Sequence, residues 1–359
     1  MNKKKKYFTR EGSWHHPFIN FFRKSIPFDS RIRPYAKIIA EDSRSLLRFF
    51  VPWHPLENKI PANLFMETTN ICNADCIFCA YRYQKSFRVE KGVMSKAVFE
   101  KAINEFCKLG GKTVAFSALL GDPLMDFNLI ERIRYVKDAA CCVWFYTNGI
   151  QLGKIDVESL VASGVDDIYV STSPFDRRIH ERIFRSGKYE FLLSGVKNLL
   201  KARNSVNSTL RIWLLFRSDI PWKEVIKLSD YRNEIFPLLR EKEKKAVYGQ
   251  IKCFDSWCGL IKQSDLTGIM QLAHPPLFKF RPCLWTFMLT ILWDGKVRAC
   301  PCRFSGNEGH EGDDLYIGDL NNDSLQAIWH GEKLRMLRRR FEKNNLPVAC
   351  HSCSMYRCC

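Results

Sequence analysis

The sequence predicts an α/β fold: a partial, TIM-like (β/α)6 barrel followed by a small cysteine-rich α+β domain. Two observations predict it. Between residues 63 and 255, short apolar runs alternate with segments of helical periodicity, and strands that alternate with helices form parallel sheets with helical crossovers. After residue 282, seven of the fifteen cysteines follow in a short stretch at spacings that suit metal ligands.

The barrel elements follow one another with clear start and stop signals. Ser95 is a suitable N-cap for the first barrel helix, Gly110 and Gly111 end that helix, and Gly164 ends a later one. We expect strands at about 63–69, 113–117, 142–146, 167–171, 210–216 and 246–254. We expect helices at about 95–109, 127–139, 156–162, 189–203 and 222–231, and a solvated helical stretch at 232–245.

The chain divides into four parts. Residues 63–255 form the predicted barrel, 256–282 a connector, and 283–359 the cysteine-rich domain. Residues 1–62 read as a basic, irregular extension. Within that extension, residues 35–51 could form an amphipathic helix that caps the barrel or rests on a membrane surface, and we favour capping.

Composition narrows the classes of function and location. The net charge of +18 would attract nucleic acid, anionic lipid or phosphorylated substrates, or it reflects a solvated basic surface. No signal peptide and no apolar run of membrane-spanning length is evident, so we expect no transmembrane segment. Fifteen cysteines, an odd number, at metal-ligand spacings indicate reduced thiols and a cytoplasmic location rather than a disulfide framework.

A cysteine triad directly after the first strand is the most informative motif. Cys72, Cys76 and Cys79 have the spacing C-x3-C-x2-C. Three thiolates are one short of the four that complete an iron–sulfur cluster, so one iron would stay open to a non-protein ligand. The alternatives are a zinc knuckle or buried free thiols. A zinc site needs a fourth Cys or His nearby, and none follows within about twenty residues.

This loop resembles the cluster loop of the radical S-adenosylmethionine (SAM) superfamily, in which an aromatic residue precedes the last cysteine, as Phe78 does here. The resemblance extends over roughly 63–359. It implies that Cys72, Cys76 and Cys79 hold a [4Fe–4S] cluster whose fourth iron binds SAM. It further implies that SAM is cleaved reductively to methionine and a 5′-deoxyadenosyl radical, which abstracts hydrogen from a substrate. An external donor such as flavodoxin or ferredoxin would supply the electron.

The segment after the second strand resembles the family's Gly-Gly-Glu-Pro motif, which binds the amino group of SAM. Here it reads Leu120-Gly121-Asp122-Pro123, with Leu for the first Gly and Asp for Glu. Gly121 would allow close backbone approach, and Asp122 would accept from the ammonium. The alternative is an ordinary Gly-Asp-Pro turn.

Three later segments also resemble SAM-binding segments of the family. Asn148 lies in a Thr-Asn-Gly turn after the third strand, which either contacts SAM or only ends the strand. Ser171 and Ser173, at the end of the fourth strand, are candidates for the SAM ribose, with Ser171 preferred. Arg185, and after it Arg182, is the candidate for the SAM carboxylate; the alternative is an exposed arginine at a helix end.

The C-terminal cysteines resemble those of SPASM/twitch auxiliary iron–sulfur domains, through Gly295-x4-Cys300 and Cys350-x2-Cys353-x5-Cys359. A strand near 289–293 and the Asp-Gly turn after it predict a hairpin that presents Cys283 and Cys300 from its two arms. The resemblance implies one auxiliary [4Fe–4S] cluster, because two clusters held by cysteine need eight thiolates and this region has seven. Its ligands would be Cys283, Cys300, Cys350 and Cys353.

Alternatives remain at this second site. Cys302 could replace Cys300, and Cys358 or Cys359 could replace one ligand or serve a second, incomplete cluster. A four-cysteine zinc ribbon uses the same ligands. Elsewhere, Cys107, Cys141 and Cys142 lie in helix or strand patterns and are predicted to be small buried apolar residues.

The leading hypothesis is a radical SAM enzyme, an oxidoreductase acting on a small polar molecule such as a sugar or cyclitol. Its auxiliary cluster would accept a second electron or position the substrate. The second hypothesis is a maturase that modifies a peptide or protein side chain. The third is a non-catalytic metal-binding adaptor that binds RNA through its charge, although no RNA-binding motif occurs within 63–359.

The pattern assigns no catalytic side chain. Five residues near strand ends would either face the substrate or pack the barrel mouth: Trp213, Arg217, Asp255, Ser256 and Trp257.

Overall fold

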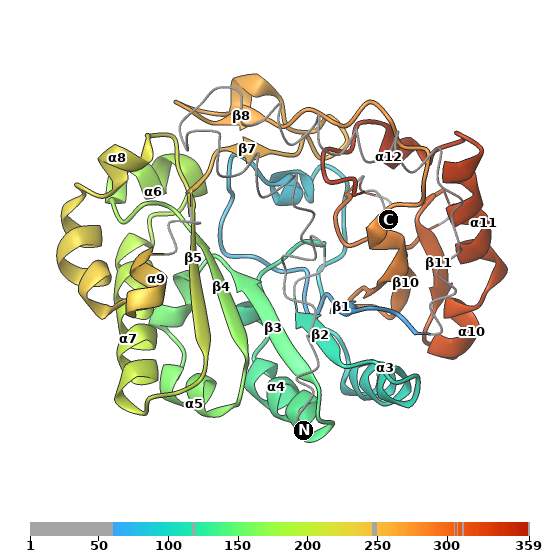
Figure 1. Cartoon of the computed structure of the whole chain (residues 1–359), viewed down its shortest axis with the longest axis horizontal. Coiled ribbons are helices and arrows are strands. Elements are labelled where there is room, and N and C mark those ends of the chain that lie inside the picture. Colours follow the sequence, from blue (N-terminus) through green and yellow to red (C-terminus); the bar gives the residue numbers. More distant parts are fainter. Residues whose placement is uncertain are drawn as a thin grey trace, which may run out of the picture.

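The computed structural model describes residues 60–116, 119–245, 250–304, 306, 308–310 and 312–357 (Figure 1). Nearly all of the predicted extension, including the expected helix at 35–51, lies outside the described residues, as do Cys358 and Cys359. None of the helices in the described part of the chain combines the length and the apolar composition that a bilayer crossing requires.

The predicted α/β fold is confirmed. Six strands run parallel in the order of the sequence: β1 (Leu64–Met66), β2 (Thr113–Phe116), β3 (Cys142–Thr147), β4 (Asp167–Thr172), β5 (Arg211–Arg217) and β6 (Gln250–Ile251). The helices between them are α3 (Lys96–Lys108), α4 (Leu129–Asp138), α5 (Val157–Ala162), α6 (Arg177–Phe184), α7 (Tyr189–Ser205), α8 (Trp222–Val225) and α9 (Glu241–Lys245). The sheet curves, with α3, α4, α5 and α7 along its outer side (Figure 1).

The helix signals of the sequence act as expected. The Ser95 hydroxyl accepts a hydrogen bond from Val98 N at 3.2 Å, which caps α3. Gly110 follows this helix with φ +90°, a conformation that glycine adopts without a Cβ penalty. Helix α6, which the sequence analysis did not identify, is capped by Asp176, whose carboxylate accepts from Ile179 N at 2.9 Å.

Two expected elements differ in the structure. The helix predicted at 222–231 is the single turn of α8, and a short π-helical turn follows at Tyr231–Ile235. The strand predicted at 246–254 becomes β6 and β7 (Cys253–Phe254). The chain leaves the main sheet at Lys252, because β7 pairs with β8 (Gln271–Leu272) instead of with β5.

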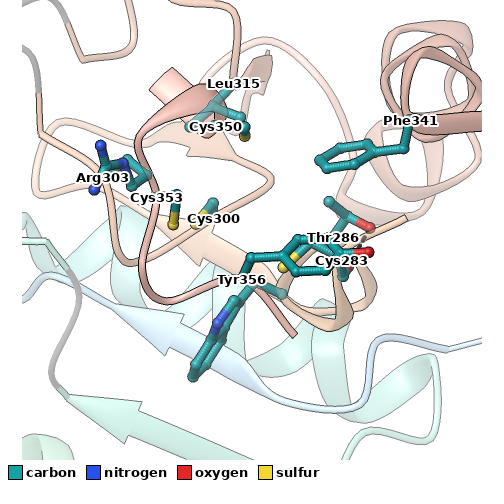
Figure 2. A pocket seen from close by; sticks show the side chains of 10 residues that line it. Cys283, Thr286, Cys300, Arg303, Leu315, Phe341, Cys350, Cys353 and Tyr356 are labelled. Atoms are coloured by element: carbon teal, nitrogen blue, oxygen red, sulfur yellow. Dashed lines mark hydrogen bonds between the residues drawn. The ribbon is translucent and has the colours of Figure 1, made fainter. Parts of the chain in front are cut away.

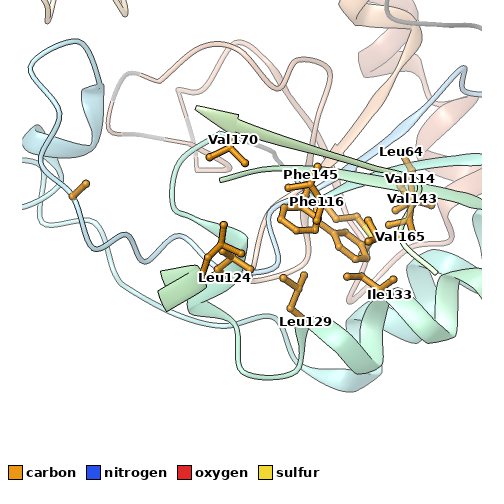
Figure 3. Close-up of a cluster of buried hydrophobic side chains, with 14 of the residues drawn as sticks. Leu64, Val114, Phe116, Leu124, Leu129, Ile133, Val143, Phe145, Val165 and Val170 are labelled. Atoms are coloured by element: carbon orange, nitrogen blue, oxygen red, sulfur yellow. The ribbon is translucent and has the colours of Figure 1, made fainter. Parts of the chain in front are cut away.

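The core lies between the sheet and its helices. Phe116 and Phe145 point from β2 and β3 toward Leu129 and Ile133 of α4 (Figure 3), and all four are buried. Cys141 is buried as expected and Cys107 is partly buried, with 3.3 Å between their sulfur atoms. For Cys142 the expectation is wrong. It is exposed because it begins β3, where strand alternation turns its side chain away from the core.

The opposite, concave face of the sheet carries a ladder of half-buried aromatic rings. The ring centroids of Trp144 and Tyr146 are 5.7 Å apart, those of Tyr146 and Tyr169 4.9 Å, and those of Tyr169 and Trp213 6.1 Å. These residues alternate along their strands with core residues, so they face away from the helices.

The C-terminal region extends the same sheet. Its elements are β9 (Leu289–Ile291), β10 (Lys296–Arg298), β11 (Tyr316–Asp319), α10 (Leu325–Trp329), α11 (Glu332–Glu342) and α12 (Val348–His351). Strand β9 pairs in parallel with β1, and β10 pairs antiparallel with β9 as the predicted hairpin. Within the described residues one nine-stranded sheet therefore runs from β11 to β6, across the predicted domain limit at residue 283.

Candidate metal centres

The loop after β1 carries the cysteine triad, and α6 holds it in place. Asp75 N donates to the carbonyl oxygen of Phe184 at 3.1 Å, and Ile77 N donates to that of Ile183 at 3.0 Å. Both carbonyls belong to the last turn of α6, where helix carbonyl groups lack partners of their own. The C-terminal end of α6 thus fixes the backbone between the first and last cysteines.

The three thiols of this loop are largely buried and close enough to repel one another when ionised. Burial raises the pKa of Cys72 to about 12 and that of Cys79 to about 11, and it raises the pKa of Cys76 well above the ordinary value. Thiolates in such a place need a compensating positive charge, which bound metal supplies. The donor set therefore fits a metal-bound, deprotonated state.

The triad does not surround a single ion. Among the residues that the structure describes, no three Cys, His, Asp or Glu side chains converge as ligands of one metal ion. In an iron–sulfur cluster each thiolate binds a different iron, so its ligands stand further apart.

Gly121 and Asp122 bring the loop after β2 against the triad. Gly121 has φ +85°, and a Cβ there would collide with the carbonyl oxygen of Thr69. Asp122 N donates to the carbonyl oxygen of Ile71 at 2.9 Å. Pro123 is buried and begins the short helical turn that follows. These contacts place the backbone of the segment directly beside the cysteine loop.

The carboxylate of Asp122 is used inside the protein. It accepts from Leu124 N at 3.0 Å, from the Thr147 hydroxyl at 2.9 Å and from Asn148 N at 2.7 Å. Complete burial raises its pKa to about 6, an effect that these hydrogen bonds oppose. Asp122 therefore joins the loops after β2 and β3, and its contact with a SAM ammonium stays a prediction.

Asn148 lies beside the first cysteine. Its amide nitrogen donates to Asn73 Oδ1 at 2.8 Å and lies 3.5 Å from Cys72 Sγ, while its amide oxygen accepts from Ile150 N at 2.8 Å. The Thr-Asn-Gly turn thus orients the cysteine loop.

The two candidate serines have different surroundings. The Ser171 hydroxyl accepts from Arg217 Nε at 2.9 Å, and this guanidinium lies 5.6 Å from the ring centroid of Phe78. Ser173 is completely buried, and its hydroxyl lies 3.1 Å from His180 Nδ1. Arg217 thus links Ser171 to the cysteine loop, while Ser173 lies in the core.

The candidate arginines separate in the same way. Arg185 ends α6 with φ +49°, and its guanidinium lies 3.8 Å from the carboxylate of Asp75 in the cysteine loop. Arg182 instead donates from Nε to Asp219 Oδ2 at 2.7 Å. Of the two, Arg185 lies at the candidate site.

A cavity lies in the C-terminal region, with about 330 Å³ of space that includes open solvent (Figure 2). The four cysteines predicted as auxiliary ligands all line it: Cys283, Cys300, Cys350 and Cys353. Trp285, Phe341 and Tyr356 supply apolar walls. Cys302 is outside the lining, although its backbone N lies 3.4 Å from Cys300 Sγ.

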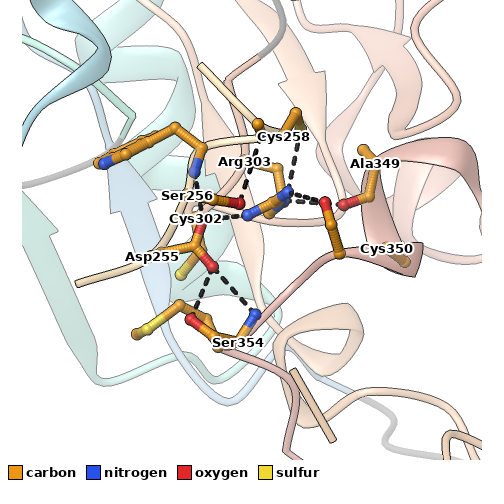
Figure 4. A network of polar contacts seen from close by, with 12 residues as sticks. Asp255, Ser256, Cys258, Cys302, Arg303, Ala349, Cys350 and Ser354 are labelled. Atoms are coloured by element: carbon orange, nitrogen blue, oxygen red, sulfur yellow. Dashed lines mark hydrogen bonds and ion pairs between the residues drawn. The ribbon is translucent and has the colours of Figure 1, made fainter. Parts of the chain in front are cut away.

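Arg303 also lines this cavity, and it anchors the loop that carries two of the cysteines (Figure 4). It is 1% exposed and forms an ion pair with Asp255. Its other hydrogen bonds go to the Ala349 carbonyl at 2.8 Å, Ser352 Oγ at 3.2 Å and Cys258 Sγ at 3.0 Å. The sequence analysis missed Arg303, although its place directly after Cys302 was a signal.

Asp255 and Trp257, expected near the barrel mouth, connect the two centres. Asp255 accepts from Trp257 N at 2.7 Å and from Ser354 N at 2.9 Å. Trp257 Nε1 donates to the carbonyl oxygen of Phe78 at 3.0 Å. The loop after β7 thus contacts both cysteine loops. Trp213 and Ser256 instead pack locally: Trp213 Nε1 donates to Asp167 Oδ1 at 2.8 Å, and Ser256 Oγ accepts from Gly259 N at 3.3 Å.

Comparisons with known proteins agree with this geometry. Residues 66–228 match the radical SAM superfamily, and residues 283–354 match SPASM, an iron–sulfur cluster-binding domain. The chain is 24% identical over 325 residues to a tungsten-containing aldehyde ferredoxin oxidoreductase cofactor-modifying protein of Pyrococcus furiosus, which covers 82% of this chain and 88% of that protein. It is 23% identical over 177 residues to a probable GTP 3′,8-cyclase of Pyrococcus horikoshii, covering 49% of this chain and 55% of that protein.

Among solved structures, SuiB of Streptococcus suis bound to precursor peptide SuiA superimposes with a TM-score of 0.52 at 13% identity, over 89% of this chain and 76% of SuiB. This likeness supports the fold. From the two matched families and the two cysteine sites, the chain belongs to the radical SAM superfamily, carries a C-terminal SPASM domain, and has SAM and [4Fe–4S] clusters as its cofactors.

Proposed function

We propose that this protein is a radical SAM oxidoreductase that oxidises a small polar substrate, with a sugar or cyclitol as the leading substrate class. The observation that carries the proposal is the cavity lined by four cysteines, whose ligand loop is tied through Asp255 and Trp257 to the first cysteine loop. Two linked iron–sulfur sites suit a two-electron oxidation, in which hydrogen-atom abstraction removes only the first electron.

At the first site we assign Cys72, Cys76 and Cys79 as ligands of a [4Fe–4S] cluster. With SAM bound, this cluster would supply the electron for reductive cleavage of SAM, and the resulting 5′-deoxyadenosyl radical would abstract a hydrogen atom from the substrate. The carbonyls of α6 hold the loop, and Asn148 orients Cys72.

We further propose that three groups of the protein bind SAM at this site. The backbone at Gly121, which packs against Thr69 and Asn70 at the start of the cysteine loop, would receive the amino group. Ser171 binds the ribose, and Arg185 binds the carboxylate. Arg185 lies beside Asp75 of the cysteine loop, and Ser171 is linked to that loop through Arg217, which lies over the ring of Phe78.

At the second site we assign Cys283, Cys300, Cys350 and Cys353 to one auxiliary [4Fe–4S] cluster, which would supply an acceptor for the second substrate electron. The substrate would then lose one hydrogen atom, one electron and one proton. Apolar walls from Trp285 and Tyr356 limit access of water to this site.

A second candidate function is maturation of a larger substrate, a peptide or another cofactor. The similarity to the cofactor-modifying protein of Pyrococcus furiosus, which extends over 82% of this chain, favours it. SuiB, whose solved structure contains a precursor peptide, shares the fold.

We also propose a cytoplasmic location and an external flavodoxin or ferredoxin as electron donor. The thirteen cysteines within the described residues form no disulfide, which suits a reducing compartment.

The first experiment tests SAM cleavage. Anaerobically reconstituted protein with dithionite should form 5′-deoxyadenosine, and Cys76→Ala should abolish this while it retains the auxiliary iron. Cys300→Ala should lose the auxiliary iron, whereas Cys302→Ala should keep it. Cys142→Ala, at an exposed thiol away from both sites, is the matched control. Absence of 5′-deoxyadenosine from the iron-loaded wild type contradicts the proposal.

The second experiment separates the substrate classes. Extract from cells grown in deuterated medium is divided into a small-molecule fraction and a peptide and protein fraction. Each is incubated with the enzyme and unlabelled SAM. Deuterium in 5′-deoxyadenosine from the small-molecule fraction supports the oxidoreductase proposal, and deuterium only from the other fraction supports a maturase.

A further inference from the structure

Lys279 is a buried cation behind the loop that carries two of the auxiliary cysteines. It is 4% exposed. Its ammonium donates to the carbonyl oxygens of Cys350 at 2.6 Å and His351 at 2.7 Å. Both acceptors belong to α12, which begins the segment with Cys350 and Cys353.

The ammonium of Lys279 has no carboxylate partner in the part of the chain that the structure describes. The other two buried cations of this region each have one: Arg303 pairs with Asp255, and Arg298 pairs with Asp313. Lys279 therefore contributes a positive charge that no aspartate or glutamate among the described residues neutralises.

Both hydrogen-bond acceptors of the Lys279 ammonium belong to the segment that carries the auxiliary cysteines Cys350 and Cys353. A buried charge without a counter-charge is costly. The four-cysteine cavity is the place where the compensating negative charge would reside.

We propose that Lys279 is the fixed positive charge that compensates the auxiliary cluster and raises its reduction potential, so that this site accepts an electron. The inference rests on the auxiliary cluster proposed above. Reduction adds one negative charge to the cluster, and a nearby buried cation stabilises the more negative state. Lys279 is thus a tuning residue, and it touches neither substrate nor SAM in this proposal.

A purely structural role makes a different prediction. Lysine side chains also cap the carbonyl groups at helix C-termini, and Lys279 bonds two such groups of α12. Loss of a cap would lower stability but would leave the potential of an intact cluster unchanged. The potential is therefore the deciding measurement.

The test is an EPR-monitored redox titration of the anaerobic holoenzyme, with and without SAM. SAM alters the signal of the cluster that it binds, so the signal that SAM leaves unchanged reports the auxiliary cluster. Lys279→Met removes the charge and keeps much of the length, Lys279→Arg keeps the charge, and Lys262→Met removes an exposed lysine of the same connector as the control.

We expect Lys279→Met to lower the equilibrium constant for reduction of the auxiliary cluster at least about tenfold. For a one-electron couple this is a fall of about 59 mV in the reduction potential. In Lys279→Arg and Lys262→Met the reduction potential of the auxiliary cluster should stay close to that of the wild type. An unchanged potential in iron-loaded Lys279→Met overturns the proposal.

Loss of the cluster is informative as well. Its loss from Lys279→Met but retention in Lys279→Arg supports a requirement for the charge, whereas loss from both variants overturns it. A wild-type protein that holds iron only at the first site contradicts the auxiliary cluster itself, and iron analysis detects this before any titration.

Discussion

Trp257 Nε1 donates a hydrogen bond to the carbonyl oxygen of Phe78 at 3.0 Å, across 179 positions of the sequence. Phe78 lies between the second and third cysteines of the first cluster loop. Trp257 also donates its backbone N–H to Asp255, which accepts from Ser354 next to Cys353. One short loop therefore sets the position of both cysteine loops relative to each other.

Replacement of Trp257 by Phe tests this link. The variant keeps an aromatic ring but loses the hydrogen bond, so we expect a loss of roughly 1 kcal/mol in the free energy of unfolding. We also expect an altered EPR line shape of the SAM-binding cluster. Trp222→Phe is the control, because its indole nitrogen makes no hydrogen bond within the described residues. Equal effects of both variants on the EPR signal would contradict the link.

Loss of the Arg303–Asp255 ion pair should lower the free energy of unfolding far more than loss of an ion pair at the surface. Arg303→Met leaves the buried carboxylate of Asp255 without its partner, which costs about 3–5 kcal/mol in such cases, and we expect loss of auxiliary iron. In the control pair, Arg340 and Asp314 are each 31% exposed, so Arg340→Met should cost less than about 1 kcal/mol. Urea denaturation and iron analysis measure both effects. Comparable losses of unfolding free energy in Arg303→Met and Arg340→Met would contradict the prediction that the buried ion pair contributes more.

Ser171 and Ser173 should separate cofactor binding from stability. Ser171→Ala removes the hydroxyl near the cysteine loop, so the binding of SAM, measured by calorimetry, should weaken while stability changes little. Ser173→Ala removes the partner of buried His180 and should cost about 1 kcal/mol in stability with unchanged SAM affinity. The assignment of the ribose to Ser171 fails if Ser173→Ala alone weakens SAM binding.

Glu67 should make stability depend on pH. This carboxyl is buried at the end of β1, where it accepts from Leu120 N at 2.9 Å, and burial raises its pKa from 4.5 to about 8. Between these values the unfolded chain releases a proton that the folded protein keeps. The contribution of Glu67 to the free energy of unfolding is therefore fully present below pH 4.5. It declines as pH rises toward 8, by up to about 1.4 kcal/mol per pH unit.

Glu67→Gln mimics the protonated acid and removes this dependence. Melting temperatures of the variant relative to the wild type should therefore increase steadily from pH 5 to pH 8. For Glu90→Gln, at an exposed position, the plot of melting temperature against pH should run parallel to that of the wild type. Parallel curves for Glu67→Gln would mean that the carboxyl is already ionised in the folded protein.

Local patterns in the sequence determined most of the strands and helices of the barrel and the identity of the cysteine loops. Ser95 begins α3 as expected because a cap depends on only a few neighbouring residues. The triad could be recognised for the same reason: its three ligands lie within eight positions, from Cys72 to Cys79. Each of these features depends on residues that are close to one another in the sequence.

Only the tertiary structure decided how distant segments meet. Strand β9 pairs with β1 and makes the C-terminal region part of the barrel sheet. Ser171 rather than Ser173 is linked to the cysteine loop, through Arg217. Lys279 becomes a charge beside Cys350 although the two are 71 positions apart. Such contacts depend on how the whole chain packs, because burial and pairing partners are set by residues that no local window contains.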